Sequence, residues 1–501
     1  MTLLLVLFEV YRLTLRALVV LMAVHFFAST FGYLRRRRQG GNPAPPAVWP
    51  RVTVQLPIRN EFYAATRVLA AIGRLDYPRE LLEIQVLDDS DDGTSKLIAE
   101  HVAALEAQGF EVAHLCRSDP SGFKAGALAA GLSRARGEFV AMFDSDFVPE
   151  PDFLKRLLPH FDHERVAMVQ GVWAHLNREQ NWLTRLQAQL LDGLFVVEQT
   201  AKSRAGVPFQ FNGTAGIWRR AAIDDVGGWT FDSLTEDLDL SIRAQLAGWR
   251  LVHVPDVAVP CDLPTSLAMF RVQQRRWALG TAQLLRKRLF GILGAPLPLR
   301  SRIAIVTQLG RHLVHPLVVL MVLVAPITTF YGVPTLFEYG WLNVAVLGTL
   351  AFGIALEHAV AASAVGRSPL KAALLAPMII PLAIGLAPTY TVALFYGLRD
   401  RAGAFFRTPK MLRAPRPGEP VYRPLRSWLV VIEITIGGAY CGFAAIAGMG
   451  GLGLDAAFFG LIAFAFLWLG LGSLRTRPEL PGAPRVGAPV EAVPIPDLRR
   501  T

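Results

Sequence analysis

Residues 138–146 read EFVAMFDSD, an apolar run followed by an Asp-x-Asp pair. The apolar run from Glu138 to Phe143 predicts a short buried strand. Asp144 and Asp146 follow directly, so we expect both at the carboxyl end of that strand. In α/β sheets ligands bind outside the carboxyl ends of the strands. The Asp-x-Asp pair is therefore a candidate site, although by itself an ordinary acidic turn or helix cap is the plainer interpretation.

Short runs with β-branched residues occur on both sides of this stretch and alternate with helical segments. They predict four more strands, at Val52 to Ile58, Glu83 to Leu87, Glu111 to Leu115 and Val166 to Val172. Strands that alternate with helices imply an α/β fold with a largely parallel sheet. Glu61 follows the first of these strands, and Asp88 with Asp89 closes the second. Acidic residues therefore collect at strand ends.

The composition outside this domain is that of a membrane protein. Hydrophobic residues make up 52% of the 501 residues and charged residues only 18%, which excludes a disordered chain. Residues Leu3 to Leu34 are long enough to span a bilayer and end in Arg35 to Arg38, which places the following segment in the cytoplasm. We interpret the stretch as an anchor, not a removed signal peptide. Further apolar segments lie near 313–331, 341–365, 372–398, 427–449 and 454–474.

Charge predicts how many of these segments cross the membrane. The connection from Arg399 to Arg426 is rich in arginine and belongs inside, whereas the connections 332–340 and 449–454 lack Lys and Arg and belong outside. The segment 341–365 leads from the outside connection to the inside, and the connection 399–426 is also inside. The segment 372–398 between them, which contains three prolines, is therefore predicted not to cross and to be interfacial or re-entrant. The prediction is five spans with an external N-terminus, and six spans is the alternative.

The net charge of +11 and the three cysteines carry little functional weight. The basic residues cluster beside apolar segments, so we expect a lipid bilayer as partner and no nucleic acid. Cys116, Cys261 and Cys441 lie far apart in the sequence. Their spacing indicates neither a disulfide framework nor a zinc site.

Two downstream motifs complete an ordered set with the Asp-x-Asp pair. The first is Thr235-Glu236-Asp237, which follows Gly227-Gly228-Trp229. The second is Gln273-x-x-Arg276-Trp277, which lies on a stretch predicted to be helical. This set resembles the processive inverting family-2 glycosyltransferases, such as the cellulose, hyaluronan and chitin synthases. The segments 87–90 (LDDS), 122–128 (GFKAGAL) and 211–216 (FNGTAG) add a likeness to cellulose-synthase-like mannan and glucomannan synthases and their bacterial relatives. The resemblance covers about residues 50–410.

The resemblance implies a cytoplasmic GT-A (Rossmann-like) domain inserted between transmembrane helices. The implied organisation is a transmembrane helix at 1–34, the GT-A domain with interface helices at 39–300, two transmembrane helices plus the interfacial segment at 301–398, a cytoplasmic loop at 399–426, two transmembrane helices at 427–474 and a disordered tail at 475–501.

The resemblance also implies residue roles. Asp237 matches the catalytic base, with Glu236 beside it, and Trp277 matches the acceptor-binding position. Asp144 and Asp146 match the residues that hold Mg²⁺ or Mn²⁺ with the donor diphosphate. The implied donor-binding residues are Glu61, Asp88, Asp89, Lys124, Asp144, Gln273 and Arg276.

Elementary chemistry fits these roles. Inversion by one displacement needs a carboxylate that takes the acceptor proton and a cation that stabilises the departing diphosphate. Arg276 offers a planar fork to phosphate oxygens, and Trp277 offers an apolar face to a sugar ring. The plainer alternatives are that Asp237 is a salt-bridge partner, Arg276 pairs with a core acid or lipid headgroup, Trp277 anchors the interface, and Lys124 is a solvated lysine at a helix start.

Further on, residues 405–410 (FFRTPK) resemble the FxVTxK gating loop of cellulose synthases. Phe405, Thr408 and Lys410 match that pattern, whereas Arg407 replaces its Val. A basic membrane-surface loop is the plainer interpretation. Glu357 and Glu433 lie within predicted spans, where they would either bond sugar hydroxyls in a channel or pack as paired or protonated residues. The sequence favours neither reading.

The favoured function is an inner-membrane synthase that extends and translocates a β-linked polysaccharide from GDP-mannose or UDP-glucose. The second reading is a lipid glycosyltransferase that makes one transfer to a ceramide- or diacylglycerol-like acceptor. The third is a membrane scaffold with a decayed transferase domain. The expected partners are a nucleotide sugar, a polysaccharide or glycolipid acceptor and the bilayer, and the sequence leaves accessory subunits open.

Overall fold

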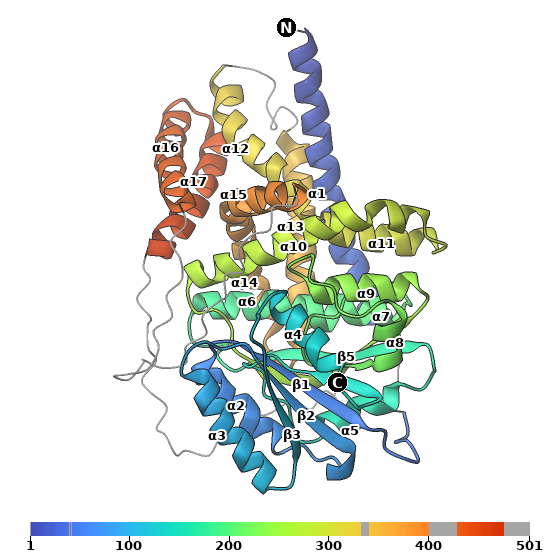
Figure 1. Ribbon diagram of the computed structural model, residues 1–501. Helices are drawn as coiled ribbons and strands as arrows, with labels where there is room; N and C mark the ends of the chain where they lie inside the picture. The colour runs from blue at the N-terminus through green and yellow to red at the C-terminus, as the bar shows by residue number, and fades with distance from the viewer. Residues whose placement is uncertain (1, 40, 42, 332–339, 400–427, 475–501) are drawn as a thin grey trace.

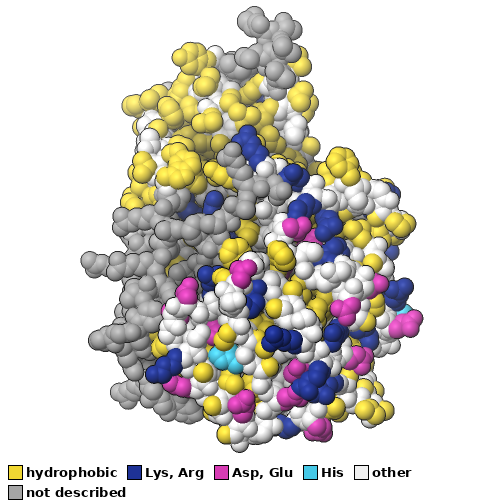
Figure 2. Space-filling model, in the orientation of Figure 1, with side chains coloured by type: hydrophobic (Ala, Val, Ile, Leu, Met, Phe, Trp, Pro, Cys, Tyr) yellow, Lys and Arg dark blue, Asp and Glu magenta, His cyan; other side chains and the backbone are white. Residues whose placement is uncertain are grey.

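A computed structural model describes residues 2–39, 41, 43–331, 340–399 and 428–474. An α/β domain lies at one end and long apolar helices at the other (Figure 1). Figure 2 shows hydrophobic side chains over the helical end of the visible face, whereas charged side chains of both signs spread over the α/β domain. The predicted gating residues Phe405, Thr408 and Lys410 and the tail 475–501 lie outside the described residues.

The core of the α/β domain is a seven-stranded mixed sheet. Its order is β3-β2-β1-β4-β6-β5-β7, with β6 antiparallel to both neighbours and the other neighbouring pairs parallel. The strands are β1 (Val52–Ile58), β2 (Leu82–Asp88), β3 (Glu111–Cys116), β4 (Phe139–Met142), β5 (Val166–His175), β6 (Gly216–Arg219) and β7 (Arg250–Cys261).

All five predicted strands are confirmed, and the sequence missed β6 and β7. β6 has only four residues and begins at a glycine, so it shows no readable alternation. β7 contains Pro255 and Pro260, which argue against a central strand; it is accommodated because it lies at the edge of the sheet.

Helices cover both faces of the sheet. Residues of α2 and α3 share one apolar core with β1 and β2, and residues of α4, α8 and α9 share a second core with β4, β5 and β6. β1 and β2 alternate apolar with polar residues, yet nearly every position is buried, because the polar side chains bond one another across the pair: Thr53 donates to Glu83 over 2.6 Å and Gln55 to Gln85 over 2.9 Å. The domain helices are α2 (Phe62–Ile72), α3 (Thr94–Ala107), α4 (Phe123–Leu132), α5 (Phe153–Leu157), α6 (Trp182–Asp192), α7 (Thr200–Arg204), α8 (Arg220–Asp225) and α9 (Glu236–Leu246).

Except for the two helices between residues 267 and 310, where no apolar segment is predicted, the remaining helices agree with the predicted apolar segments to within a few residues. They are α1 (Thr2–Arg36), α10 (Leu267–Gly294), α11 (Leu299–Gly310), α12 (Val314–Phe330), α13 (Gly340–Ala364), α14 (Pro369–Leu375), α15 (Ile379–Leu398), α16 (Leu429–Met449) and α17 (Gly453–Leu474). Six helical stretches among the described residues are long and apolar enough to cross a membrane, 369–398 among them. This confirms the prediction of a multi-pass membrane protein, while the number of crossings stays a prediction.

The helix α15 lies beside α10. The Tyr390 hydroxyl donates to Gln274 Oε1 over 2.9 Å. Nearer the ends of both helices, a Cβ on Gly397 would lie only 2.6 Å from Ala282 Cβ, so only glycine permits this approach. The contacts run in the same order along both helices, so α15 runs parallel to α10. The helix α10 is not one of the six apolar stretches.

A buried ion pair joins α10 to the last two helices. Arg271 Nη2 donates to Glu433 Oε2 over 2.7 Å and to Ser473 Oγ over 3.0 Å, and Arg271 Nη1 bonds the other Glu433 oxygen. Both charged side chains are at most 5% exposed. Of the two interpretations that the sequence left open for Glu433, the structure agrees with the paired packing residue. Glu357 on α13 is also buried and lies against Gly193.

Candidate active site

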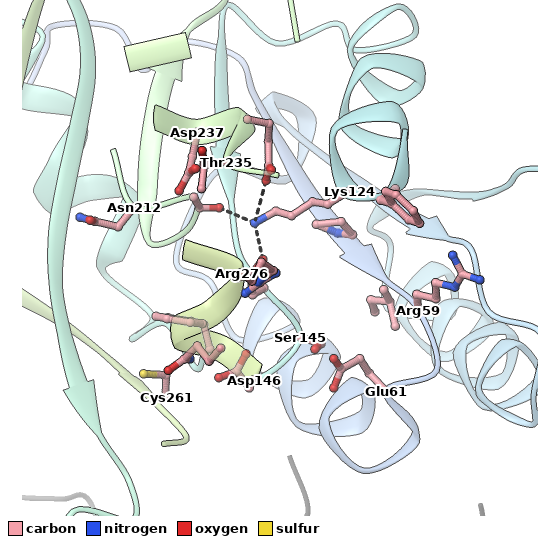
Figure 3. Close-up of a pocket in the computed structure, with 18 of the residues that line it drawn as sticks. Arg59, Glu61, Lys124, Ser145, Asp146, Asn212, Thr235, Asp237, Cys261 and Arg276 are labelled. Atoms are coloured by element: carbon pink, nitrogen blue, oxygen red, sulfur yellow. Dashed lines mark hydrogen bonds and ion pairs between the residues drawn. The ribbon is translucent and has the colours of Figure 1, made fainter. Parts of the chain in front are cut away.

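A cavity opens at the carboxyl ends of the parallel strands, between the α/β domain and α10 (Figure 3). The strands β2 and β4 both pair in register with β1, so all three end at the same edge. The predicted residues that line the cavity are Glu61, Asp89, Lys124, Asp144, Asp146, Glu236, Asp237, Gln273, Arg276 and Trp277.

The Lys124 ammonium lies at the centre of this cavity. Its Nζ atom donates to Asp144 Oδ1 over 2.6 Å and to the Gly213 carbonyl over 2.8 Å, and lies 3.9 Å from Glu236 Oε1. Burial alone would lower the pKa of Lys124, but the charges of Asp144 and Glu236 outweigh burial and raise that pKa. Lys124 is therefore a charged bridge between three segments, and the solvated-lysine reading is wrong.

Asp237 lies in the first turn of α9 and lines the cavity beside Glu236. Burial and the neighbouring Glu236 carboxylate raise its pKa to about 7, while Lys124 acts in the opposite direction. The Leu238 N–H donates to Asp237 Oδ1 over 2.8 Å and fixes the carboxylate. A carboxylate with a pKa near the working pH is suited to general-base catalysis.

Backbone conformation also keeps the cavity open. Gly213 has a φ of +81°, and a Cβ there would lie 2.9 Å from Asp237 Oδ2. Three non-glycine residues with positive φ, Asn60, Phe123 and Ala215, lie on segments that border the cavity. Left-handed non-glycine residues cost free energy and collect at functional sites. No local sequence pattern predicts these strained positions.

The two residues of the first acidic motif lie in different environments. Asp89 lines the cavity, and Arg117 Nε donates to its Oδ1 over 2.8 Å. Asp88 is 2% exposed and lies outside the lining. Burial would raise the pKa of Asp88, but hydrogen bonds from His114, Ser95 and Ser90 lower it. A donor-binding role for Asp88 stays a prediction.

Asp144 and Asp146 fit a hard divalent cation. Both line the cavity just beyond β4, and Thr214 Oγ1 accepts the Asp144 N–H over 2.9 Å, which orients the loop. Carboxylate oxygens beside space for a diphosphate are ligands typical of Mg²⁺ or Mn²⁺.

Sequence reasoning missed several lining residues. Arg59, Asn212, Thr235 and Asp262 also line the cavity. Asp262 directly follows β7 and pairs with Arg67. The rule that found Asp144, an acid at a strand end, would have found Asp262 had β7 been predicted.

The comparisons with known proteins support the sequence resemblance. Residues 139–356 match the family described as Glycosyl transferase family group 2. Glucomannan 4-beta-mannosyltransferase 2 of Arabidopsis thaliana is 42% identical over 250 residues, which cover 49% of this chain and 47% of that protein. Glucomannan 4-beta-mannosyltransferase 1 of Oryza sativa subsp. japonica is 39% identical over 252 residues, which cover 49% and 48%. The chain spans about half the length of these curated relatives.

A solved structure shows the same fold. The mannosyltransferase PcManGT from Pyrobaculum calidifontis, in complex with GDP-Man and Mn²⁺, is 23% identical with a TM-score of 0.50, and the match covers 77% of this chain and 100% of that chain. The predicted α/β GT-A fold class is confirmed. Residues 139–356 are therefore similar to family-2 glycosyltransferases, the family that the motifs also resemble.

Proposed function

We propose that this chain is a membrane-embedded inverting hexosyltransferase that extends a β-linked mannan or glucomannan from GDP-mannose at the cytoplasmic face of the inner membrane. One observation carries the proposal. A single cavity unites the candidate base Asp237 with Asp144, Asp146 and the α10 residues Arg276 and Trp277. The curated relatives are named glucomannan 4-beta-mannosyltransferases, which favours mannose over glucose as the transferred sugar.

The cavity residues provide the groups for one displacement. The Asp237 carboxylate takes the proton of an acceptor hydroxyl, whose oxygen attacks the anomeric carbon of the donor sugar while the bond to the diphosphate oxygen breaks. Attack from the opposite side inverts the anomeric configuration. Arg276 offers fork-shaped donors to the phosphate oxygens. Asp144 and Asp146 would hold a divalent cation, which supplies positive charge to the departing diphosphate.

The donor test uses purified protein in nanodiscs with labelled GDP-mannose or UDP-glucose in parallel. We expect label from GDP-mannose in a product that a β-mannanase digests. Polymer labelled from UDP-glucose alone would overturn the mannosyl assignment, and no transfer from either donor would overturn the enzyme proposal.

The cation proposal predicts that Asp146→Asn removes most turnover while the protein remains folded. The variant loses one charged oxygen ligand but keeps a side chain of the same shape. Turnover of labelled donor and thermal unfolding are measured together, with and without EDTA. Undiminished wild-type turnover in EDTA would contradict the proposal.

A polymerase must hold its acceptor after each transfer. Trp277 lines the cavity on α10 and can stack on the terminal sugar of the chain, an aromatic contact worth about 1 kcal/mol or more. Trp277→Ala is expected to shorten the products while donor binding stays largely intact. Gel filtration and thin-layer chromatography of labelled product measure this effect.

The same measurement separates polymer synthesis from the glycolipid alternative. A solvent-extractable lipid with one sugar as the sole wild-type product, however long the reaction runs, would overturn the polymer proposal. A Trp277→Ala product of wild-type length would overturn the acceptor role of Trp277.

We also propose that 369–398 does not cross the membrane, which leaves five spans. Its α15 lies parallel to α10, whose residues Arg276 and Trp277 border the cavity. In a background without native cysteines, Ser368→Cys and Arg399→Cys are expected to react with a membrane-impermeant thiol reagent from the same side. Reaction from opposite sides would mean six spans.

A further inference from the structure

Three metal-ligating side chains converge on one face of the sheet, beside the cavity. The strands β2 and β3 pair in parallel, with Asp88 opposite Cys116 (Figure 1). His114 lies two residues before Cys116, and side chains two residues apart on a strand share a face. The register therefore places Asp88, His114 and Cys116 on the same face. The sequence spacing of the cysteines gave no hint of this group.

The distances within the group are those of ligands around one ion. Asp88 Oδ2 lies 3.0 Å from His114 Nε2 and 4.0 Å from Cys116 Sγ, and His114 Nε2 lies 3.4 Å from Cys116 Sγ. Ligands bound at zinc distances in a tetrahedron are separated by roughly 3.2 to 3.7 Å. The triangle matches one face of such a tetrahedron with a shift of only a few tenths of an ångström.

The donor types distinguish this group from the oxygen ligands in the cavity. A thiolate and an imidazole are ligands for Zn²⁺ and other borderline-soft ions, whereas Mg²⁺ and Mn²⁺ prefer oxygen. Asp88 lies outside the lining that contains Asp144 and Asp146. Cys116 is exposed, so a fourth position faces solvent and can take a water molecule.

Neighbouring groups already orient the carboxylate. The Ser90 N–H donates to Asp88 Oδ1 over 2.9 Å, which leaves Oδ2 directed at His114. The Ser95 hydroxyl on α3 also donates to Oδ2. Such outer hydrogen bonds are what fix the ligands of metal sites in proteins.

We propose that Asp88, His114 and Cys116 bind one Zn²⁺ ion, with water as the fourth ligand, at a site separate from the cation site of the cavity. Two of the ligands are adjacent in sequence to an ion pair at the cavity: Asp89, which lines the cavity, follows Asp88, and Arg117, which pairs with Asp89, follows Cys116. The ion would therefore cross-link the carboxyl ends of β2 and β3 next to the Asp89–Arg117 pair.

The test uses the full chain in detergent, freed of metal with a chelator and kept in excess Mg²⁺, with Co²⁺ as the spectroscopic probe. We expect a thiolate-to-cobalt charge-transfer band with the visible bands of tetrahedral Co²⁺, both abolished by one equivalent of Zn²⁺. The band reports sulfur ligation, so Co²⁺ bound to carboxylates alone does not produce it.

Matched variants assign the ligands. Cys116→Ser is expected to abolish the charge-transfer band. His114→Ala removes a ligand, so it is expected to weaken Zn²⁺ binding by more than the roughly 10- to 100-fold that loss of an outer hydrogen-bond partner costs, as measured by competition with a chromophoric chelator. Cys441→Ser, which removes an exposed cysteine of α16, is expected to keep both signals. Thermal unfolding in Mg²⁺ checks that each variant is folded.

Three results would overturn the site: wild-type protein without a charge-transfer band, a band that persists in folded Cys116→Ser, or Zn²⁺ affinity unchanged in folded His114→Ala. None of them bears on transfer from a nucleotide sugar, so the proposed function is tested separately.

Discussion

Asp237→Asn is expected to lower turnover by about 10² to 10⁴ fold, the usual effect of removing a general base. The amide has the size of the carboxylate but cannot take the proton of the acceptor hydroxyl. Donor binding, measured by titration with the nucleotide sugar, is expected to change little. For the wild type, kcat/KM is expected to fall roughly tenfold per pH unit below about pH 7, because Asp237, whose pKa is raised to about 7, must be ionised to act.

The same substitution is expected to raise the unfolding temperature of the donor-free protein in EDTA. Burial and Glu236 raise the pKa of Asp237 in the folded state, so the wild-type fold loses stability as pH rises from about 4 to 7. Asn carries no such penalty. The difference in unfolding temperature is therefore expected to be largest above pH 7 and to shrink toward pH 4.

A matched control is Asp232→Asn, which removes a largely exposed carboxylate that pairs with Lys287 outside the cavity. We expect it to leave turnover and its pH profile near wild type. Wild-type turnover in Asp237→Asn, at equal protein levels, would place the base elsewhere.

Glu433→Leu is expected to destabilise the protein by about 3 to 5 kcal/mol, because it leaves the buried Arg271 guanidinium without its carboxylate partner. Turnover is expected to fall as well. Arg271 lies two residues before Gln273 on the helix that also carries Arg276 and Trp277, so a shift of this helix displaces residues that line the cavity.

The double variant Arg271→Met with Glu433→Leu separates pairing from burial. Replacing both charges with apolar side chains of similar volume is often neutral or stabilising, so we expect stability and turnover to recover toward wild type. As a surface control, Glu179→Gln removes a partner of Arg367 in a pair whose side chains are 61% and 47% exposed, and it should cost no more than about 1 kcal/mol. An unchanged unfolding temperature in Glu433→Leu would show that the pair does not hold α10 to α16.

Much of this molecule could be predicted from its sequence, because the informative signals are local. The pattern of apolar and β-branched residues predicted five strands and the membrane helices to within a few residues, because this pattern depends only on residues that are neighbours in the sequence. Acids at strand ends, together with the 235–237 and 273–277 motifs, predicted most of the charged residues in the cavity. Parallel strands that end at one edge bring such residues together without further information.

Contacts between side chains that lie far apart in the sequence could not be predicted, because they depend on how the whole chain folds. Lys124 bonds Gly213, 89 residues away, and Arg271 bonds Glu433, 162 residues away. Cys116 and His114 meet Asp88 because β3 lies beside β2 in one particular register. Such contacts depend on strand order, register and helix packing, which no local pattern encodes. A one-residue change in strand register would turn the same side chains to the opposite face of the sheet.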